Sequence, residues 1–425
     1  DSANESNLLS NLFREEVPYQ FDNTEKIFPI DSRYSFALIT FRKSEKMESV
    51  FYASNVMHLS NPARKVFFEK GDFWKFNPNT GTCFFPRTKR DLELCRKIYD
   101  NCGGVFVKER DESKNPWSLK TIGMFHMTND SGLFHMSNPD GQLVPLYEGK
   151  MIHQFDLRFA SFDGVVNSSG EPVPSEVDWE RKKDSAYQVK PRFWVRPEVV
   201  GSKLLDKGDV GAWCKGWVLT FRSISRSTDQ RTLISCVLPS CWGVGNSSLV
   251  LFPSVSEERA SCLLSNLNSI VLDYVVRVKQ TGANLNQFIF KQLPVLHPKS
   301  YQGSDIEYIA TRTARLTKNA DVLSNCWLKD YPSEPYQDPK ERLQIRAELD
   351  AYFAHLYGLS RTDLEYILDP ISVCGPDHPS VTFPGLKRDE IAQYGEYLTQ
   401  RLVLEAYDAL AKTPRFAKTT GTAEA

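Results

Sequence analysis

The segment 217–297 constrains the fold most, because strand-like and helical patterns follow one another within it. Over residues 217–222, successive side chains alternate between an apolar face and a mixed face, which is the period of a half-buried strand. A polar hinge at 223–230 separates this run from a second strand-like run at 231–239. We therefore predict a β-hairpin at the start of the segment.

An apolar stripe at helical spacing follows the hairpin, a Gly/Asn/Ser loop and a short strand at 249–252. The stripe consists of Leu263, Leu267, Ile270, Val271, Tyr274 and Val275. This spacing is typical of a helix that buries one side. A polar loop with basic and amide side chains, residues 277–286, comes next. The whole segment predicts a small α+β unit that holds two hydrogen-bonding loops on a rigid frame.

The distribution of charge singles out the same part of the chain. The 425 residues carry a net charge of −1. Residues 181–299 contain 17 Lys and Arg against 8 Asp and Glu, a surplus of +9, so the remaining residues sum to −10. A basic segment in an acidic chain indicates a surface for a polyanion. The alternative is an ordinary solvated face.

Length and composition narrow the class of protein. A chain of 425 residues has room for about two or three domains. It has no run of 18 apolar residues, so we expect no membrane span. The nine cysteines are scattered and no CxxC motif occurs, which favours reduced thiols, a cytoplasmic location and no structural zinc. The polar start without methionine or signal peptide suggests a fragment of a longer protein.

The flanking regions contain one strong strand and several helices. Residues 35–42 are apolar enough for the central strand of a sheet. Helical spacing of apolar residues appears at 91–100, 305–327, 340–357 and 387–411. The last three helices are predicted to brace the central unit.

A short run at 147–158 supplies a second group of polar candidates. In an extended conformation, Gln154, Asp156 and Arg158 lie on one side of the run, and Lys150 precedes them. These side chains could lie near DNA phosphates. Equally, Asp156 and Arg158 could form a local ion pair.

Two groups of residues resemble metal-dependent sites only superficially. The set His126, Asp130 and His135 lacks a further ligand or a catalytic glutamate at a fixed spacing. Asp178, Glu180 and Lys182 match the carboxylate–carboxylate–lysine order of nucleases. They lie in a linker-like stretch, 162–185, without a strand pattern. No P-loop, no Ser-His-Asp signature, no Asn/Asp-Pro-Pro-aromatic tetrapeptide and no Gly-rich cofactor loop is present.

Seven short stretches nevertheless resemble one family when taken in order. They are Phe28-Pro-Ile-Asp-Ser-Arg-Tyr-Ser-Phe-Ala-Leu38, Asn77-Pro-Asn-Thr-Gly-Thr82, Phe125-His-Met-Thr-Asn-Asp-Ser131, Leu146-Tyr-Glu-Gly-Lys-Met-Ile-His-Gln-Phe-Asp156, Phe221-Arg222 with Thr228-Asp-Gln-Arg-Thr232, Gln292-Leu-Pro294 and Gln393-Tyr-Gly-Glu-Tyr397. Together they resemble the C-terminal part of large bacterial DNA N6-adenine methyltransferases. These are the type IIG-like restriction-modification proteins and their relatives in BREX and DISARM phage defence.

The resemblance implies an α/β plus α+β fold. Residues 1–60 would contribute the last strands of a Rossmann-like methyltransferase sheet, and residues 61–165 a connecting region. Residues 166–300 would form a target-recognition domain like those of type I specificity subunits. Residues 301–425 would be a helical C-terminal region.

The resemblance also implies methyl transfer from S-adenosylmethionine to a flipped adenine. Because the catalytic tetrapeptide and cofactor loop are missing, we assign no catalytic, cofactor or metal residues to this chain. It is expected to be inactive alone. Its expected partners are double-stranded DNA and a methyltransferase catalytic domain, either in the same full-length protein or in a companion chain.

We therefore predict a DNA sequence-recognition module. The predicted DNA contacts are Arg222, Arg226, Arg231, Lys279, Gln280, Asn284, Asn286, Lys150, Gln154 and Arg158. Arginine suits guanine and amides suit adenine, while phosphate contacts position the protein. The alternatives are a metal-dependent nuclease that acts alone, centred on the Asp178 group, and a structural scaffold without DNA affinity.

Overall fold

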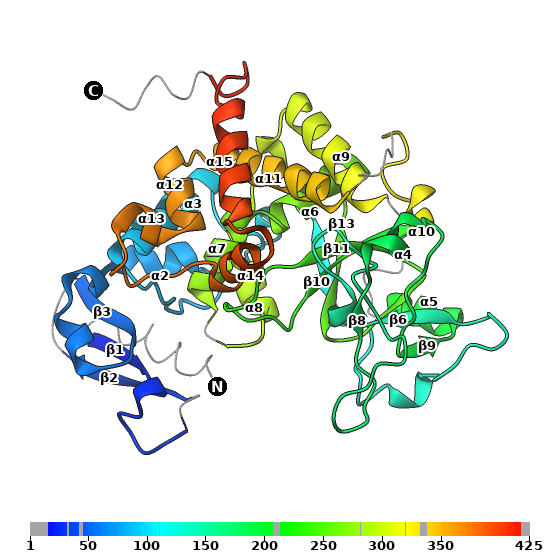
Figure 1. Cartoon of the computed structure of the whole chain (residues 1–425), viewed down its shortest axis with the longest axis horizontal. Coiled ribbons are helices and arrows are strands. Elements are labelled where there is room, and N and C mark those ends of the chain that lie inside the picture. The colour runs from blue at the N-terminus through cyan, green and yellow to red at the C-terminus, as the bar shows by residue number, and fades with distance from the viewer. Residues whose placement is uncertain are drawn as a thin grey trace.

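The computed structural model describes residues 16–31, 34–41, 46–109, 111–206, 213–280, 282–318, 320–331 and 338–417. Within them the fold is mixed α/β, with small sheets set among many helices (Figure 1). The N-terminal sheet lies at one end of the molecule and the other sheets lie toward the opposite end (Figure 1). The first fifteen residues of the predicted methyltransferase-like part lie outside the described residues.

The N-terminal sheet has four strands in the order β2-β1-β3-β4. They are β1 (Glu16–Asp22), β2 (Ser35–Phe41), β3 (Lys46–Ala53) and β4 (Val66–Glu69). β1 pairs antiparallel with β2 and parallel with β3. The prediction that residues 35–42 form a central strand is wrong, because β2 is the edge strand and Leu38 is 50% exposed. Its apolar run signalled a strand but not its place in the sheet.

Two helices follow this sheet, α2 (Lys70–Phe76) and α3 (Lys89–Cys102). α3 confirms the helix predicted at 91–100, and its predicted apolar side is buried. Thr88 and Asp91 form a capping box at its start, in which each side chain binds the other residue's backbone N–H. Gly103, with a φ of 78°, ends the helix.

The central sheet confirms the predicted hairpin. Its order is β11-β10-β13-β5, with every neighbouring pair antiparallel. The strands are β5 (Leu119–Ile122), β10 (Trp217–Arg222), β11 (Ser235–Pro239) and β13 (Ser248–Pro253). β10 is buried on both faces rather than one, and residues 149–151 are among the segments that contact it.

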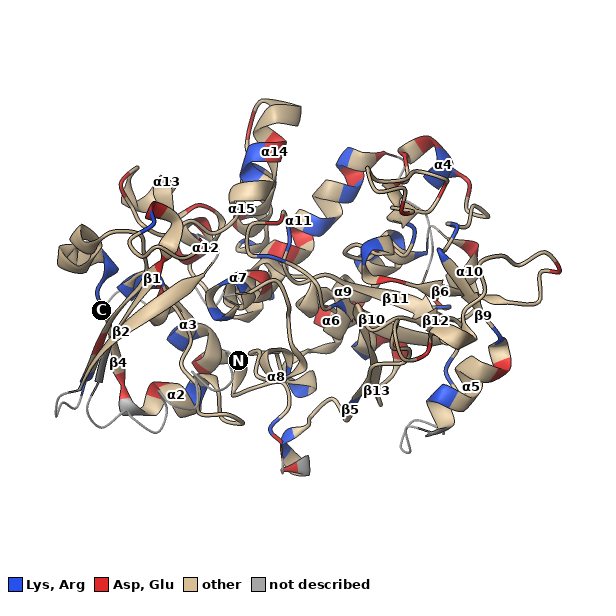
Figure 2. Ribbon diagram, turned by 90° about the horizontal axis from the view of Figure 1, so that it is seen from below, with Lys and Arg blue, Asp and Glu red and all other residues tan. Residues whose placement is uncertain are grey.

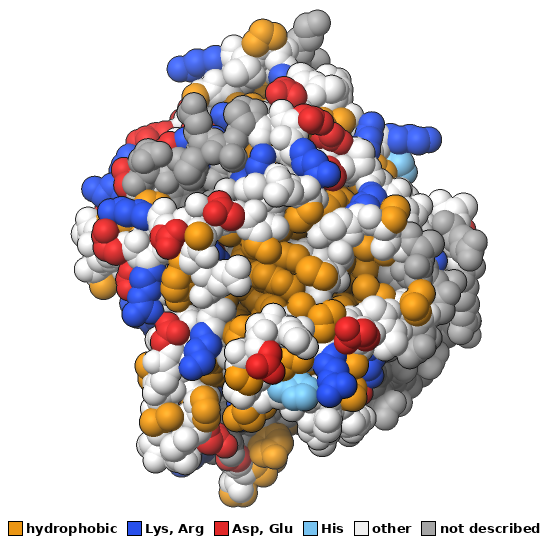
Figure 3. All heavy atoms as spheres, turned by 90° about the vertical axis from the view of Figure 1, so that its right-hand side faces the viewer, with side chains coloured by type: hydrophobic (Ala, Val, Ile, Leu, Met, Phe, Trp, Pro, Cys, Tyr) orange, Lys and Arg blue, Asp and Glu red, His pale blue; other side chains and the backbone are white. Residues whose placement is uncertain are grey.

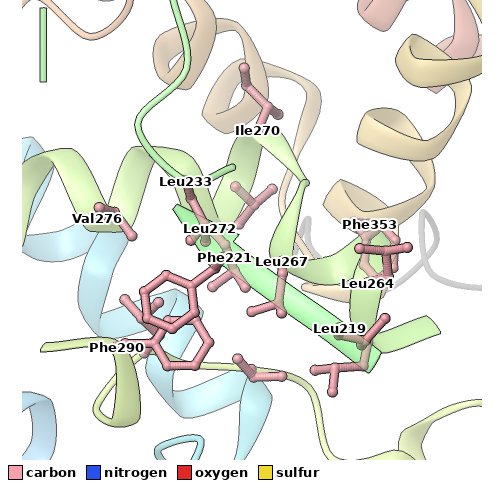
Figure 4. Packing of buried hydrophobic residues seen from close by; sticks show 14 of the residues in the cluster. Leu219, Phe221, Leu233, Leu264, Leu267, Ile270, Leu272, Val276, Phe290 and Phe353 are labelled. Carbon is pink, nitrogen blue, oxygen red and sulfur yellow. The ribbon is translucent and has the colours of Figure 1, made fainter. Parts of the chain in front are cut away.

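The apolar stripe at 263–275 forms two helices instead of one. They are α6 (Glu257–Leu267) and α7 (Ile270–Lys279), and the Ser269 side chain caps the second. Their apolar side chains pack against the central sheet and α8 (Gln287–Lys291). The rings of Phe221 and Phe290 stack at 3.9 Å beside Leu267 (Figure 4).

Two smaller sheets and their helices lie beside the central sheet. The order β12-β6-β9 joins β12 (Gly243–Val244), β6 (Val144–Tyr147) and β9 (Phe193–Val195), while β7 (Ala160–Ser161) pairs with β8 (Ser175–Glu176). Two helices accompany them, α4 (Trp179–Lys183) and α5 (Pro197–Asp206). Strand pairing crosses the predicted boundary at residue 166, since β6 pairs with β9 and β5 with β13.

Helices make up the C-terminal region, as predicted. They are α9 (Gly303–Thr317), α10 (Asp321–Ser324), α11 (Pro339–Leu356), α12 (Arg361–Leu368), α13 (Pro370–Cys374), α14 (Pro384–Tyr394) and α15 (Leu398–Leu410). The single helix predicted at 387–411 is divided into α14 and α15, because Gly395 adopts a φ of 79° and ends α14. Among the described residues, no helix combines the length and apolar character needed to cross a lipid bilayer.

Leu267 lies on α6, which packs against the central sheet, so substitution of Leu267 tests how much this packing contributes to stability. Its side chain is fully buried. We expect Leu267→Ala to lower the free energy of unfolding by about 2–5 kcal/mol, because it leaves a cavity. Urea denaturation measures this change. Met57→Ala, at a position 76% exposed, is the control. Equal loss in both variants would contradict the assignment of Leu267 to the core.

Candidate nucleic-acid interface

The two polar loops predicted from the sequence lie side by side. The Ser225 N–H donates to the Ala283 carbonyl oxygen at 3.0 Å, and the Leu285 N–H donates to Ser223 O at 2.7 Å. Ile224 and Asn284 form an isolated antiparallel bridge between these bonds. A short two-stranded ribbon therefore fixes the two loops relative to each other.

Three further segments form hydrogen bonds with these loops or with one another, although the sequence did not predict that they lie close together. Ser223 donates its N–H to Ser247 O at 2.9 Å and its hydroxyl to Asn246 O at 3.3 Å. The Met127 N–H donates to Asn246 Oδ1 at 3.4 Å, and the Gly149 N–H donates to Ser247 Oγ at 2.8 Å. We call the resulting surface, residues 126–131, 149–150, 222–226, 245–247 and 282–287, the recognition face.

The recognition face carries mainly amide, hydroxyl and cationic groups. Its exposed polar side chains are His126, Thr128, Asn129, Ser131, Arg226, Asn246, Asn284, Asn286 and Gln287. Six of these nine, on three loops, were not predicted as DNA contacts. For Gly245-Asn246-Ser247 the sequence predicts only a loop, since its position beside the hairpin loop depends on long-range contacts.

Arg222 and Arg226 are the two predicted arginines that lie on this face. Arg222 is half-buried and donates from Nε to Ile224 O at 2.7 Å, so its side chain is anchored to the ribbon. Burial lowers the pKa of Arg222 from its usual value. Arg226 is exposed, and its backbone N–H binds the Asp229 carboxylate at 3.0 Å. The Arg226 guanidinium is therefore the more accessible cation.

Arg231, the third arginine predicted to contact DNA, is buried inside the protein instead. It is 3% exposed and lies 2.8 Å from Asp350 and 3.9 Å from Asp273. Burial opposes its charge, but the two carboxylates outweigh burial and raise the pKa of Arg231. An arginine enclosed in this way is unavailable to DNA.

Lys279 and Gln280 are also buried, contrary to the prediction. Residues 277–279 form the last turn of α7 rather than a loop. Lys279 Nζ donates to Tyr99 Oη, Phe76 O and Gln292 O at 2.7–2.9 Å. Gln280 Nε2 donates to Ser225 O at 2.6 Å and Gly282 O at 2.8 Å. Gln280 thus holds the two loops together from beneath instead of reading a base.

The second predicted group, at 150–158, is largely internal. Arg158 is 1% exposed and donates to the carbonyl oxygens of Lys182, Asp184 and Tyr187. The Asp156 carboxylate pairs with Lys182 at 2.7 Å and accepts from the Arg158 backbone N–H at 2.8 Å. Burial opposes the ionisation of Asp156, but Lys182 and Arg342 outweigh it and lower its pKa to about 2.

Gln154 and Lys150 complete this group. Gln154 is fully buried; its Nε2 donates to Leu233 O and Asn268 O, and its Oε1 accepts from Arg346. Lys150 alone reaches the surface, half-buried, with its Nζ 3.6 Å from Glu148 and 5.0 Å from the Phe162 ring centroid. Of this group, only Lys150 lies on the recognition face.

Arg277 braces the hairpin loop from inside the protein, a role that the sequence did not reveal. Its Nε donates to Asp273 at 2.9 Å. Its terminal nitrogens donate to the carbonyl oxygens of Ser227, Asp229 and Gln230 at 2.6–3.1 Å. The backbone that carries Arg226 is therefore fixed by a buried guanidinium.

The basic surplus of residues 181–299 does not form one charged surface. Three of its cations, Arg231, Arg277 and Lys279, are buried. Basic and acidic residues alternate along α5 and α11, and do not gather on one element (Figure 2). Exposed cations of this segment, among them Arg181, Lys190 and Lys299, also lie outside the recognition face.

The Asp178 group does not have the arrangement of a nuclease centre. Asp178 caps α4, Glu180 pairs with Lys183, and Lys182 pairs with Asp156. The His126 group is equally occupied, since Asp130 accepts from the His126 N–H and pairs with Lys203. Across the part of the chain that the structure describes, no group of three His, Cys, Asp or Glu side chains could hold a metal ion.

An apolar hollow marks the side of the molecule that carries α5 and β9 (Figure 3). A pocket of about 250 Å³ is lined in part by the stacked rings of Tyr147 and Trp242, with centroids 5.0 Å apart. Arg158 lies against this pocket, with its guanidinium bound to carbonyl oxygens.

Comparisons with known proteins identify no family for the chain. No protein-family model matches it, and no curated protein matches it. The assignment of a function therefore depends on the geometry above and on the resemblance of the short motifs.

Lys279 gives a pH-dependent test of the frame beneath the loops. Burial lowers the pKa of Lys279 to about 7. In the unfolded chain a lysine keeps its proton up to about pH 10.4. The unfolded state thus binds more protons between these values, so the free energy of unfolding should rise with pH there.

Lys279→Met removes this titration. We expect the difference in free energy of unfolding, wild type minus variant, to grow from pH 7 to pH 10 and to stay constant below pH 7. Urea denaturation at a series of pH values measures the difference. A constant difference across the whole range would mean that Lys279 remains protonated in the folded protein.

Proposed function

We propose that this chain is the DNA sequence-recognition part of a site-specific DNA N6-adenine methyltransferase from a restriction-modification or phage-defence system. It would act in the cytoplasm, bind duplex DNA and present the target adenine to a catalytic domain that this chain does not contain. We also propose that residues 1–60 contribute the last strands of a Rossmann-like methyltransferase sheet. Residues 166–300 would form a domain like those of type I specificity subunits.

One observation carries the proposal. Four segments that are separate in the sequence, 126–131, 222–226, 245–247 and 282–287, bring exposed arginine, asparagine and glutamine side chains onto one face beside the central sheet. Amides and arginines are the groups that read base edges, while backbone N–H groups, hydroxyls and cations contact phosphates. Of the predicted contacts, Arg222, Arg226, Asn284, Asn286 and Lys150 remain in the proposal.

S-adenosylmethionine does not fit the N-terminal sheet of this chain. The segment after β1 has no Gly-rich turn, and Asn23 uses its amide within the segment, on Phe28 and Ile30. The proposed contribution of this chain is binding and positioning of DNA.

Arg226 provides the direct test. We expect Arg226→Ala to weaken binding to duplex DNA and to reduce the slope of log K against log salt by about one, as for the loss of one phosphate contact. Fluorescence anisotropy with a labelled duplex pool at several salt concentrations measures both quantities. Arg388→Ala, at a side chain 76% exposed on α14, is the matched control.

The same duplex pool separates sequence reading from general phosphate binding. Enrichment of bound duplexes over successive rounds should yield a consensus sequence, because the amide groups discriminate between bases. Binding without any enrichment, or identical salt slopes for Arg226→Ala and Arg388→Ala, would contradict the proposal. Cleavage of plasmid DNA with magnesium would instead support the nuclease alternative.

A further inference from the structure

A cleft of about 660 Å³ opens between α2, the end of α3 and residues 103–116. Its lining includes the aromatic and basic side chains Trp74, Lys75, Lys108, Lys114 and His297. None of these residues belongs to the recognition face. The cleft thus combines the indole ring of a tryptophan with three lysine side chains.

Trp74 is 62% exposed, although tryptophan is ordinarily mostly buried. Its position is fixed by Gly81, whose φ is +63°. A Cβ atom at Gly81 would lie only 2.9 Å from Trp74 Cη2. The indole therefore rests against the turn at 77–82 while most of its surface faces solvent. A ring held in this way is a platform for stacking by a planar group.

The opposite wall of the cleft is held rigidly by the same turn. Asn79 Nδ2 donates to Val107 O at 2.9 Å, and Asn79 Oδ1 accepts from the Glu109 N–H at 2.8 Å. The Phe106 N–H donates to Leu293 O at 2.8 Å. The motif Asn77-Pro-Asn-Thr-Gly-Thr82 thus positions both the Trp74 ring and the segment that carries Lys108.

The charges of the cleft suit a phosphate beside a base. Lys75 pairs with Asp100 at 2.8 Å, and Lys114 lies 3.4 Å from Asp111. The charge of Lys108 also acts on the nearby Asp111 carboxyl and helps to lower its pKa, and no ion pair joins Lys108 to a carboxylate among the described residues, so its ammonium can bind an anion in the cleft. The last carbonyl groups of α3 and the Asp100 carboxylate can accept hydrogen bonds from the amino group of a base.

From these observations we infer that the cleft binds a nucleotide, with its base stacked on Trp74 and its phosphate at Lys108. The nucleotide is either free in solution or an unpaired nucleotide within a strand. The inference does not depend on the proposed duplex recognition, because the two surfaces share no residue.

Isothermal titration calorimetry with the whole chain tests the inference. The probes are adenosine monophosphate and a single-stranded oligonucleotide of eight deoxyadenosines. We expect Trp74→Ala to weaken binding by about tenfold to a hundredfold, as for the loss of one stacked base. Lys108→Glu should weaken binding of both probes and lower its salt dependence. Trp74→Phe should retain most of the affinity, because it keeps an aromatic ring.

Two controls separate this site from general effects. Met57→Ala and Lys340→Glu alter an exposed apolar and an exposed basic side chain outside the cleft, and neither should change the affinity. Binding of the mononucleotide assigns a free nucleotide, and binding of the oligonucleotide alone assigns a strand. Absence of binding by both probes, or equal affinities for wild type and folded Trp74→Ala, would overturn the inference.

Discussion

The buried carboxylate of Asp273 is the group on which the recognition face depends. It is fully buried and accepts hydrogen bonds from the Thr232 N–H and from Arg277 Nε. A buried charge without a partner costs several kcal/mol, so Asp273 and Arg277 require each other. Arg277 in turn binds three carbonyl oxygens of the hairpin loop, and Arg231 joins Asp273 to Asp350 on α11. The conformation of an exposed polar loop is thus fixed by charges in the core.

This arrangement explains how a chain with almost no net charge could recognise a polyanion. Five cations are buried in the described part of the chain, and one of them, Arg277, fixes the backbone that carries the exposed Arg226. Rigid mounting lowers the entropy lost when side chains bind a partner. The helices α7 and α11 support the recognition face without contributing its exposed groups. The Trp74 cleft follows the same principle, since Gly81 and Asn79 hold its two walls.

Local features of the sequence predicted the local structure well. The hairpin at 217–239, the helix after Thr88 and the helix that begins near residue 340 follow from periodicity and capping, which depend on neighbouring residues. The site was predicted only in part, because Arg226 and Arg231 look alike in the sequence. Arg231 is buried by Asp350, which lies 119 residues away. Asn246 lies on the recognition face because its backbone contacts Ser223, and no local sequence pattern predicts that contact.

Hydrogen exchange measured with and without duplex DNA tests the central claim most directly. The account predicts that DNA slows exchange in segments 222–226, 245–247 and 282–287 together, since they form one face. Exchange in segment 178–183, which lies on α4, should not change. Protection confined to α4 or to the C-terminal helices, with no effect on the three loops, would contradict the account.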